Sequence, residues 1–211
     1  MNPRQVTLRG VHLGMGRAEV ESSLIAEGFS RTSATSWGRY PDTSAGEAHE
    51  TILIGYHGVG EDEALSIVHY TRSWRWTNFD EQFGTDEARR AEVRRLLAAD
   101  PQVWTSFPGP PQAGNHFAFA VNQREARRLT SDRLKSCFWA WDCVSVRDGV
   151  DCRPVVDRAQ GAVIEGEYRM RAQLTIEMFD YDQFAGDLMR DPAFRERDLE
   201  GRDCPTFYVG H

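Results

Sequence analysis

The sequence predicts an α+β protein in which two diverged helix-plus-antiparallel-sheet units form a two-layer domain, with sheet on one side and helices on the other. Two amphipathic helices are expected, over Arg17–Glu27 and Thr85–Ala99, and each precedes several short runs of alternating polar and apolar residues. Turn-rich stretches separate these runs, which favours antiparallel strands. We expect the first unit to span 1–83, the second 84–180, and short helices and a tail that packs back to span 181–211.

The first helix has clear start and stop signals. Gly16 can serve as the N-cap, and Glu19 then lies three residues on, where a carboxylate reaches back to the cap. Gly28 lies where a left-handed stop is needed. The apolar residues expected to be buried here are Val20, Leu24 and Ile25 on the helix, with Leu8, Val11, Leu13 and Met15 on a short apolar strand before it.

Three strands should follow the first helix. One short strand is expected around Trp37–Tyr40, and Thr51–Tyr56 and Ala64–Arg72 should form an antiparallel hairpin. In the second hairpin strand, alternation puts Leu65, Ile67, His69 and Thr71 on one face. Trp74 and Trp76 are expected to extend that strand on a single face, and residues 77–84 to break it.

The second helix begins the second unit. Thr85 caps it, and the expected apolar stripe is Val93, Leu96 and Leu97. Trp104–Gly114 should be a stiff loop and Gly161–Gly166 a turn region. The strands expected between and after these segments are His116–Asn122, Cys137–Val146, Val150–Val155 and Arg169–Phe179.

The opening stretch carries a family resemblance. Gly10–Phe29 reads Gly-Val-x-Leu-Gly-Met, a polar residue, Glu-Val, and a Leu-x-x-x-Gly-Phe ending. This motif resembles the first helix of small tandem-repeat domains of bacterial envelopes, namely the β-lactamase-inhibitor-protein fold and the small lipoprotein of outer-membrane barrel assembly. The resemblance implies a binding module, in the inhibitor fold one that binds through an aromatic-rich concave sheet. It transfers no catalytic residue.

Composition narrows the possible partners. The formal net charge of −7 disfavours nucleic acid. No stretch approaches the length of apolar sequence that a membrane span requires. We expect a periplasmic or secreted location if a signal peptide has been removed, and a cytoplasmic one otherwise.

The four cysteines allow one disulfide hypothesis. Cys143 and Cys152 flank the turn signal Asp148-Gly149. A four-residue loop would set the two cysteines opposite each other, close enough to bridge, whereas a two-residue loop would pair Cys152 with Ser145. The alternative is two free, half-buried thiols, and a bond also requires an oxidising compartment.

Recognisable catalytic signatures are missing from the sequence. There is no Gly-x-Ser-x-Gly and no His-Glu-x-x-His, and the histidines are scattered over separate predicted elements. We therefore expect no cofactor and no metal site. A small hydrolase or ligand-binding protein, with a site that the sequence does not reveal, remains the alternative to a binding protein.

The remaining feature is aromatic. Trp74, Trp76, Trp139 and Trp141 form two pairs at i, i+2 on predicted strands, so each strand should offer two indoles on one face. One interpretation places them in the core between sheet and helices. The other is that they bind a partner, because Trp is enriched at binding hot spots. The sequence thus predicts a non-enzymatic protein-binding module of a bacterial envelope, whose unidentified protein partner contacts these four residues.

Overall fold

The structure is a computed structural model that describes residues 2–41, 48–58, 63–100, 103–106, 115–120, 146–147, 150–151, 162–169 and 172–180. Its helices are the 3-10 helix η1 (Pro3–Gln5), α1 (Arg17–Ala26), α2 (Trp76–Phe83) and α3 (Asp86–Leu97). Its strands are β1 (Ser30–Arg31), β2 (Ser36–Arg39), β3 (His49–His57), β4 (Ala64–Ser73), β5 (Val103–Ser106), β6 (Asn115–Ala120), β7 (Val146–Arg147), β8 (Val150–Asp151), β9 (Ala162–Arg169) and β10 (Gln173–Asp180).

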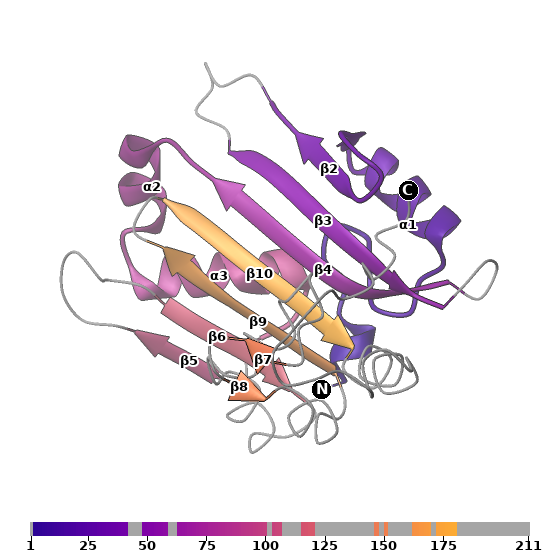
Figure 1. Cartoon of the computed structure of the whole chain (residues 1–211). Helices are drawn as coiled ribbons and strands as arrows, with labels where there is room; N and C mark the ends of the chain where they lie inside the picture. The colour runs from indigo at the N-terminus through magenta and orange to yellow at the C-terminus, as the bar shows by residue number, and fades with distance from the viewer. Residues whose placement is uncertain are drawn as a thin grey trace.

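One eight-stranded sheet organises the described part of the chain (Figure 1). Its order is β1-β2-β3-β4-β10-β9-β6-β5, and every neighbouring pair is antiparallel. The strands β1 to β4 therefore make one half of the sheet and β5, β6, β9 and β10 the other, and β4 meets β10 in the middle. The strands β7 and β8 form a separate hairpin. The predicted α+β class with an antiparallel sheet is confirmed.

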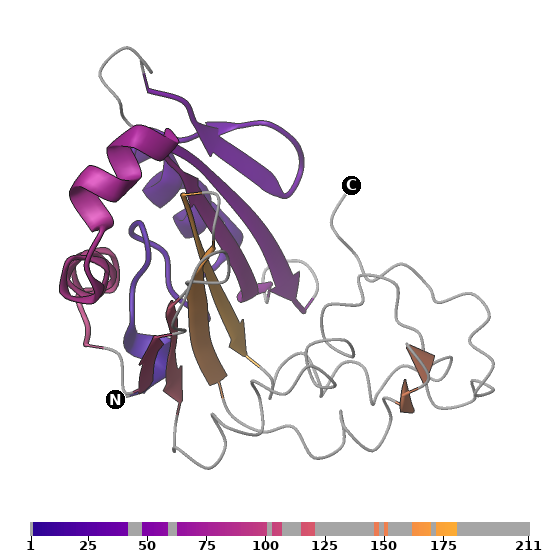
Figure 2. The same ribbon diagram turned by 90° about the vertical axis from the view of Figure 1, so that its left-hand side faces the viewer.

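The helices lie on one side of the sheet (Figure 2). Residues from α1 and α3 join a single hydrophobic core with the strand residues that face them. We call this side of the sheet the helix face and the other side, on which no described helix lies, the open face. On β10 the residues Thr175, Glu177 and Phe179 point to the open face and are buried. The most deeply buried side chains of the helix face include Leu24, Ile52, Ile54, Val68, Leu97, Leu174 and Ile176.

The first helix begins and ends where the sequence predicted. The Gly16 amide donates to the Glu19 carboxylate at 3.2 Å, and Gly28 has a φ of +82°. Two details differ. Ile25 is 64% exposed, so the buried stripe is narrower than expected. The segment before the helix is not a strand, although its four predicted apolar residues are all buried.

The second predicted helix is also confirmed, as α3, but the chain before it differs from the prediction. Thr85 caps α3 by accepting from the Ala88 amide at 3.2 Å. The strand β4 ends at Ser73, and Trp76 is the first residue of α2. The prediction that Trp74 and Trp76 extend one strand face was therefore wrong, because the chain turns into a helix between them.

A β-bulge in β4 changes which face of the sheet the residues before it point to. Tyr56 pairs with Leu65 while Gly55 pairs with Ile67, which leaves Ser66 as an extra residue. Leu65 is thereby turned onto the helix face, where it is fully buried. Ile67, His69 and Thr71 remain together on the open face, so the predicted four-residue face loses only its first member. The hydroxyl of Ser66 donates to the Gly55 carbonyl at 3.3 Å.

The second half of the sheet contains strand where loops were expected. Trp104 begins the predicted loop Trp104–Gly114 but lies in β5. Gly161–Gly166 was expected to be a turn region, yet residues 162–166 belong to β9 and pair with β10 on one side. Pairing along both edges of β9 overrides the local preference of Gly166, since strand preference depends strongly on context. In turn, β10 starts at Gln173, so the predicted strand Arg169–Phe179 takes in the last residue of β9 and most of β10.

Candidate functional site

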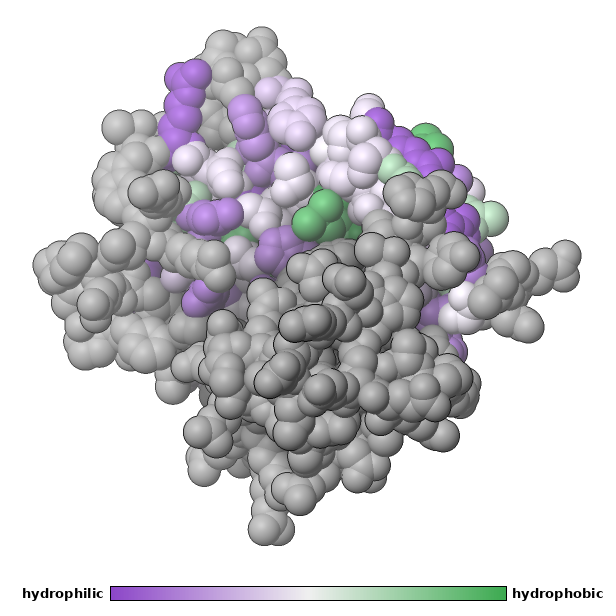
Figure 3. All heavy atoms as spheres, viewed as in Figure 1, coloured by the Kyte–Doolittle hydropathy of each residue, from purple (hydrophilic) through white to green (hydrophobic). Residues whose placement is uncertain are grey.

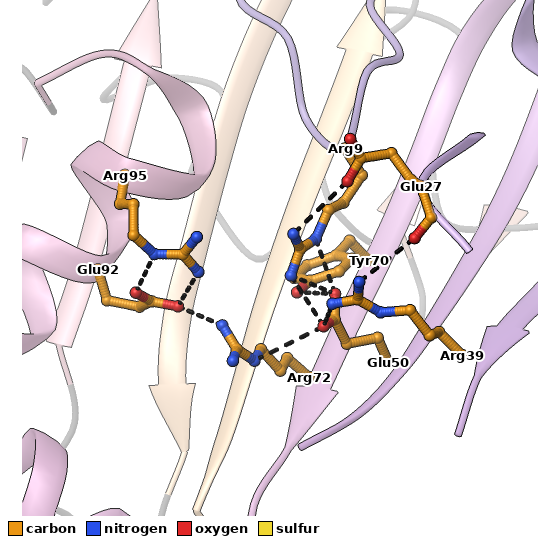
Figure 4. A network of polar contacts seen from close by, with 8 residues as sticks. All are labelled: Arg9, Glu27, Arg39, Glu50, Tyr70, Arg72, Glu92 and Arg95. Atoms are coloured by element: carbon orange, nitrogen blue, oxygen red, sulfur yellow. Dashed lines mark hydrogen bonds and ion pairs between the residues drawn. The ribbon is translucent and has the colours of Figure 1, made fainter. Parts of the chain in front are cut away.

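The helix face contains an unusual buried carboxylate, that of Glu50 on β3, which is 1% exposed (Figure 4). It accepts two hydrogen bonds from Arg9, at 2.8 Å each, and one from the hydroxyl of Tyr70 at 2.7 Å. Arg39 donates a further hydrogen bond, and Nε of Arg72 lies 3.9 Å from Oε1 of Glu50. We call these five residues the Glu50 cluster.

Arg9 reaches this carboxylate from a tight turn. Leu8 and Val11 exchange backbone hydrogen bonds of 2.8 and 3.1 Å, and the two residues between them, Arg9 and Gly10, have φ values of +51° and +74°. A two-residue turn of this kind favours Asn, Asp or Gly at both positions. An arginine with positive φ is strained, and here the bidentate ion pair with Glu50 offsets that strain.

The cluster also joins the helices to the sheet. Arg39 donates at 3.3 Å to the carbonyl of Glu27, the residue that ends α1, and so satisfies a helix-terminal acceptor. On the other side Arg72 forms an ion pair with Glu92 of α3. Glu92 in turn accepts from Arg95 at 2.7 and 2.8 Å. These contacts connect α1, β2, β3, β4 and α3 through one polar chain.

Electrostatics keep Glu50 ionised. Burial alone would raise the pKa of the Glu50 carboxyl. Hydrogen bonds from Arg39 and Tyr70 and the charges of Arg9 and Arg72 outweigh burial and hold that pKa below its ordinary value. The pKa of Tyr70 is raised, chiefly by burial and then by the neighbouring Glu50 charge, so its phenol stays a donor.

This arrangement suits structure better than catalysis. Two carboxylate oxygens offer about four lone-pair sites. Two donors from Arg9, one from Arg39 and one from Tyr70 account for all four. Glu50 therefore has no free acceptor site with which to take a proton from a substrate or bind a cation. We interpret the Glu50 cluster as the clamp that holds the helix layer on the sheet.

The open face has a different chemistry (Figure 3). In the view of that figure, polar and weakly polar side chains cover the visible part of the described surface, with a small hydrophobic area among them. On β4, the Thr71 hydroxyl lies 3.2 Å from Nε2 of His69, and Nδ1 of His69 lies 3.5 Å from the Glu177 carboxylate on β10. Glu177 is directly opposite His69 in the register. On this face a hydroxyl, an imidazole and a carboxylate therefore lie next to one another in that order.

A second feature of the open face is an exposed aromatic pair near the β1 edge. Tyr40 follows β2 and is 60% exposed. Its ring covers Gly38, where a Cβ atom would come within 2.4 Å of the ring. It also meets the His49 ring edge-on, with the centroids 5.6 Å apart. The glycine thus makes room for the tyrosine, which presents its remaining surface to solvent.

The predicted tryptophan site is only partly within the described residues. Trp74 is 7% exposed and packs against Phe79 and Phe83 of α2 and Tyr168 of β9, with centroid distances of 5.4, 5.0 and 6.5 Å. The core interpretation therefore holds for Trp74. Trp139 and Trp141 lie outside the described residues, and their partner-binding role stays a prediction.

The cysteine hypothesis also stays a prediction, since Cys143 and Cys152 lie outside the described residues. The adjoining hairpin has Val146 opposite Asp151 and Arg147 opposite Val150. This is the register of a two-residue loop, not of the four-residue loop on which the expected bridge depended.

Sequence reasoning missed the residues that matter on both faces. Alternation along β3 places Glu50 on the same face as Ile52 and Ile54. A charged residue on an otherwise apolar face of a predicted strand was the signal that could have revealed it. At the end of β10 the acidic residues Glu177 and Asp180 are also buried. Asp180 accepts from Arg4 at 2.6 and 2.9 Å.

Among the described residues, no three His, Cys, Asp or Glu side chains come together as a metal site would require. Within the same ranges, no helix has the length and apolar character needed to cross a membrane.

Comparison with known proteins adds no relative. No family model, no curated protein and no solved structure matches the chain.

Proposed function

We propose that this protein is a binding module of a bacterial envelope, and that it engages a protein partner through the open face of its sheet. We also propose that it consists of two diverged copies of one helix-plus-sheet unit, as the tandem-repeat resemblance of Gly10–Phe29 implies.

The order of the strands supports the two-copy proposal. In each half, helical segments precede four antiparallel strands, and the last strands of the halves, β4 and β10, pair in the middle of the sheet. Tyr70 lies opposite Ile176 at the centre of this pair. Around that point β3 corresponds to β9, β2 to β6 and β1 to β5. A duplicated unit with a rotational relation between its copies would produce this order.

One observation carries the binding proposal, namely the exposed ring of Tyr40 lying over Gly38 and against His49. Tyr is enriched among the residues that dominate binding energy, because it offers a rigid apolar surface together with a polar end. The ring is already held in place on the sheet, so little conformational freedom remains to be lost when a partner covers it. By contrast, the Glu50 cluster and the core occupy the helix face.

The proposal differs from the sequence prediction in the residues used. Trp74 lies in the core, and we propose that Tyr40, in place of Trp74, is the aromatic residue that contacts the partner. Trp139 and Trp141 remain proposed contributors.

Tyr40→Ala tests this proposal, with Ile25→Ala as its matched control. Tyr40 and Ile25 are both large, exposed apolar side chains, but Ile25 lies on α1, away from the open face. A partner captured from the source organism by the immobilised protein is identified, purified and titrated against each variant. We expect Tyr40→Ala to weaken binding by about 2 kcal/mol or more, roughly 30-fold, as at hot spots.

The control and the melting temperatures complete the test. Ile25→Ala should bind as the unchanged protein does, and neither variant should lower the melting temperature by more than a few degrees. Equal affinities for the unchanged protein and Tyr40→Ala, or an equal loss in both variants, would remove the open face as the binding surface.

A small hydrolase is the second candidate function. It is favoured by one specific observation, the arrangement of Thr71, His69 and Glu177 on the open face.

A further inference from the structure

Three side chains on the open face have the order of a nucleophile, a base and an orienting acid. Thr71 and His69 lie two residues apart on β4 and so project from the same face. The hydroxyl is 3.2 Å from Nε2 of His69, and the carboxylate of Glu177 is 3.5 Å from Nδ1, which is an ion-pair distance and not a hydrogen bond. A nucleophile within hydrogen-bond reach of a base, with the base oriented by a third group, is the general signature of covalent catalysis.

The burial of the three side chains fits these roles. The side chain of Glu177 is 11% exposed and that of His69 is 24% exposed, while Thr71 is half-buried. The Glu177 carboxylate is thus more enclosed than the His69 imidazole. The imidazole and the Thr71 hydroxyl, which would meet a substrate, retain access to solvent. In the serine-protease triad, too, the carboxylate is buried and the hydroxyl lies at the surface.

We propose that Thr71 is a nucleophile for acyl transfer from carboxylic esters, with His69 as its general base and Glu177 as the positioning residue. The inference goes beyond the binding role and does not depend on it.

The proposed step balances as follows. The Thr71 hydroxyl oxygen forms a bond to the ester carbonyl carbon as its proton moves to Nε2 of His69. The tetrahedral adduct collapses, the bond to the leaving alcohol breaks, and that alcohol departs either with the proton from His69 or as an anion, in which case His69 releases its proton to solvent. Water, deprotonated by His69, then hydrolyses the acyl-threonine and regenerates the hydroxyl. Glu177 faces the imidazolium in both half-reactions.

The surrounding sheet restricts the substrate. β4 is paired on both sides, with β3 and with β10, so its backbone amides are engaged in the sheet ladders. They do not form an oxyanion hole of the usual kind. We therefore infer that the ester is an activated one, whose leaving group departs without strong stabilisation of the oxyanion.

The experiment uses p-nitrophenyl acetate and the whole chain. Intact-mass and fragment spectra after brief exposure should show one acetyl group, on Thr71, formed together with about one equivalent of p-nitrophenolate. Thr71→Val should abolish this label. His69→Ala should slow acylation about 100-fold or more, as expected for loss of a general base, and added imidazole should partly restore the rate.

Thr51→Val is the matched control. Thr51 lies directly opposite Thr71 on β3, on the same face. This variant should be labelled like the unchanged protein. Thermal melts accompany every variant, and because Thr→Val is nearly isosteric in a strand we expect Thr71→Val and Thr51→Val to melt alike.

Glu177 is tested by a double-mutant cycle. Glu177→Gln should lower the acylation rate when His69 is present and leave the residual rate of His69→Ala unchanged, because Glu177 acts only through the imidazole. A purely structural role would lower both rates. Absence of label on Thr71 in the unchanged protein, or equal labelling of Thr71 in His69→Ala, would overturn the proposal.

Discussion

The strands β3 and β9 hold corresponding places, one on each side of the central β4–β10 pair. At one corresponding position, however, β3 carries a charged residue and β9 an apolar one. The row across β2, β3 and β4 reads Arg39, Glu50 and Arg72. The corresponding row across β6, β9 and β10 reads Phe119, Ile164 and Met178. Glu50 and Ile164 are both completely or almost completely buried. The same place in the sheet is thus charged in one half and apolar in the other.

This difference shows what a buried charge requires. Ile164 needs only packing, since burying an aliphatic side chain is favourable in itself. Glu50 must instead recover the desolvation cost of its carboxylate from Arg9, Arg39, Arg72 and Tyr70. The charged half is therefore sensitive to the loss of any single partner, whereas the apolar half should tolerate small changes of volume.

Separate replacement of Glu50 and Ile164 should have the largest effect on stability. Glu50→Gln removes the carboxylate charge that Arg9, Arg39 and Arg72 share, and we expect it to cost about 3–5 kcal/mol of unfolding free energy. Ile164→Val removes one methylene group and should cost about 0.5–1.5 kcal/mol. Urea unfolding measures both. Similar losses in the two variants would show that the charge carries no special cost.

Two buried tyrosines, one in each half of the sheet, differ in the acceptor of their hydrogen bond. The Tyr70 hydroxyl donates to the Glu50 carboxylate at 2.7 Å, and the Tyr168 hydroxyl donates to the Arg89 carbonyl at 2.9 Å. Hydrogen bonds to charged groups contribute about 1.5–3 kcal/mol, and neutral ones about 0.5–1.5 kcal/mol. Tyr70→Phe should therefore lower the unfolding free energy more than Tyr168→Phe. The reverse order in urea unfolding would contradict the account of the Glu50 cluster.

Acid provides the smallest and most selective perturbation. Because the folded-state pKa of Glu50 is depressed below the ordinary value of 4.5, its contribution to stability is complete above about pH 4.5. It is lost as the pH falls through the folded-state pKa, by at most about 1.4 kcal/mol per pH unit. Unfolding free energies of the unchanged protein and Glu50→Gln, measured from pH 6 to pH 3, should converge toward low pH. Parallel curves would argue against this assignment.

Some elements could be predicted because their signals are local. The cap at Gly16 with Glu19, the cap at Thr85 and the stop at Gly28 depend on residues within a few positions of one another, and each was confirmed. The stripe of Val93, Leu96 and Leu97 follows from helix periodicity alone.

Other predictions failed where distant segments decide. Trp76 belongs to a helix because the chain leaves the sheet after Ser73, and Leu65 faces the core because a bulge at Ser66 shifts the register. Gly166 lies in a strand because β10 and β6 pair with it on both sides. Alternation along a sequence assumes an unbroken strand, so one extra residue or an early strand end reverses the inferred face.

The fold class, the two principal helices, their caps and most of the apolar residues buried around the first helix and on α3 could be read from the sequence, because these depend on periodicity and short-range hydrogen bonding. How the polar residues are used depends on the three-dimensional arrangement. Arg9, Arg39, Glu50 and Arg72 come from four separate segments, and Glu177 meets His69 across 108 positions of the sequence only because β4 and β10 are neighbours. Charges and hydrogen bonds act over a few ångströms, so which residues share a site depends on strand order and register, which local patterns do not encode.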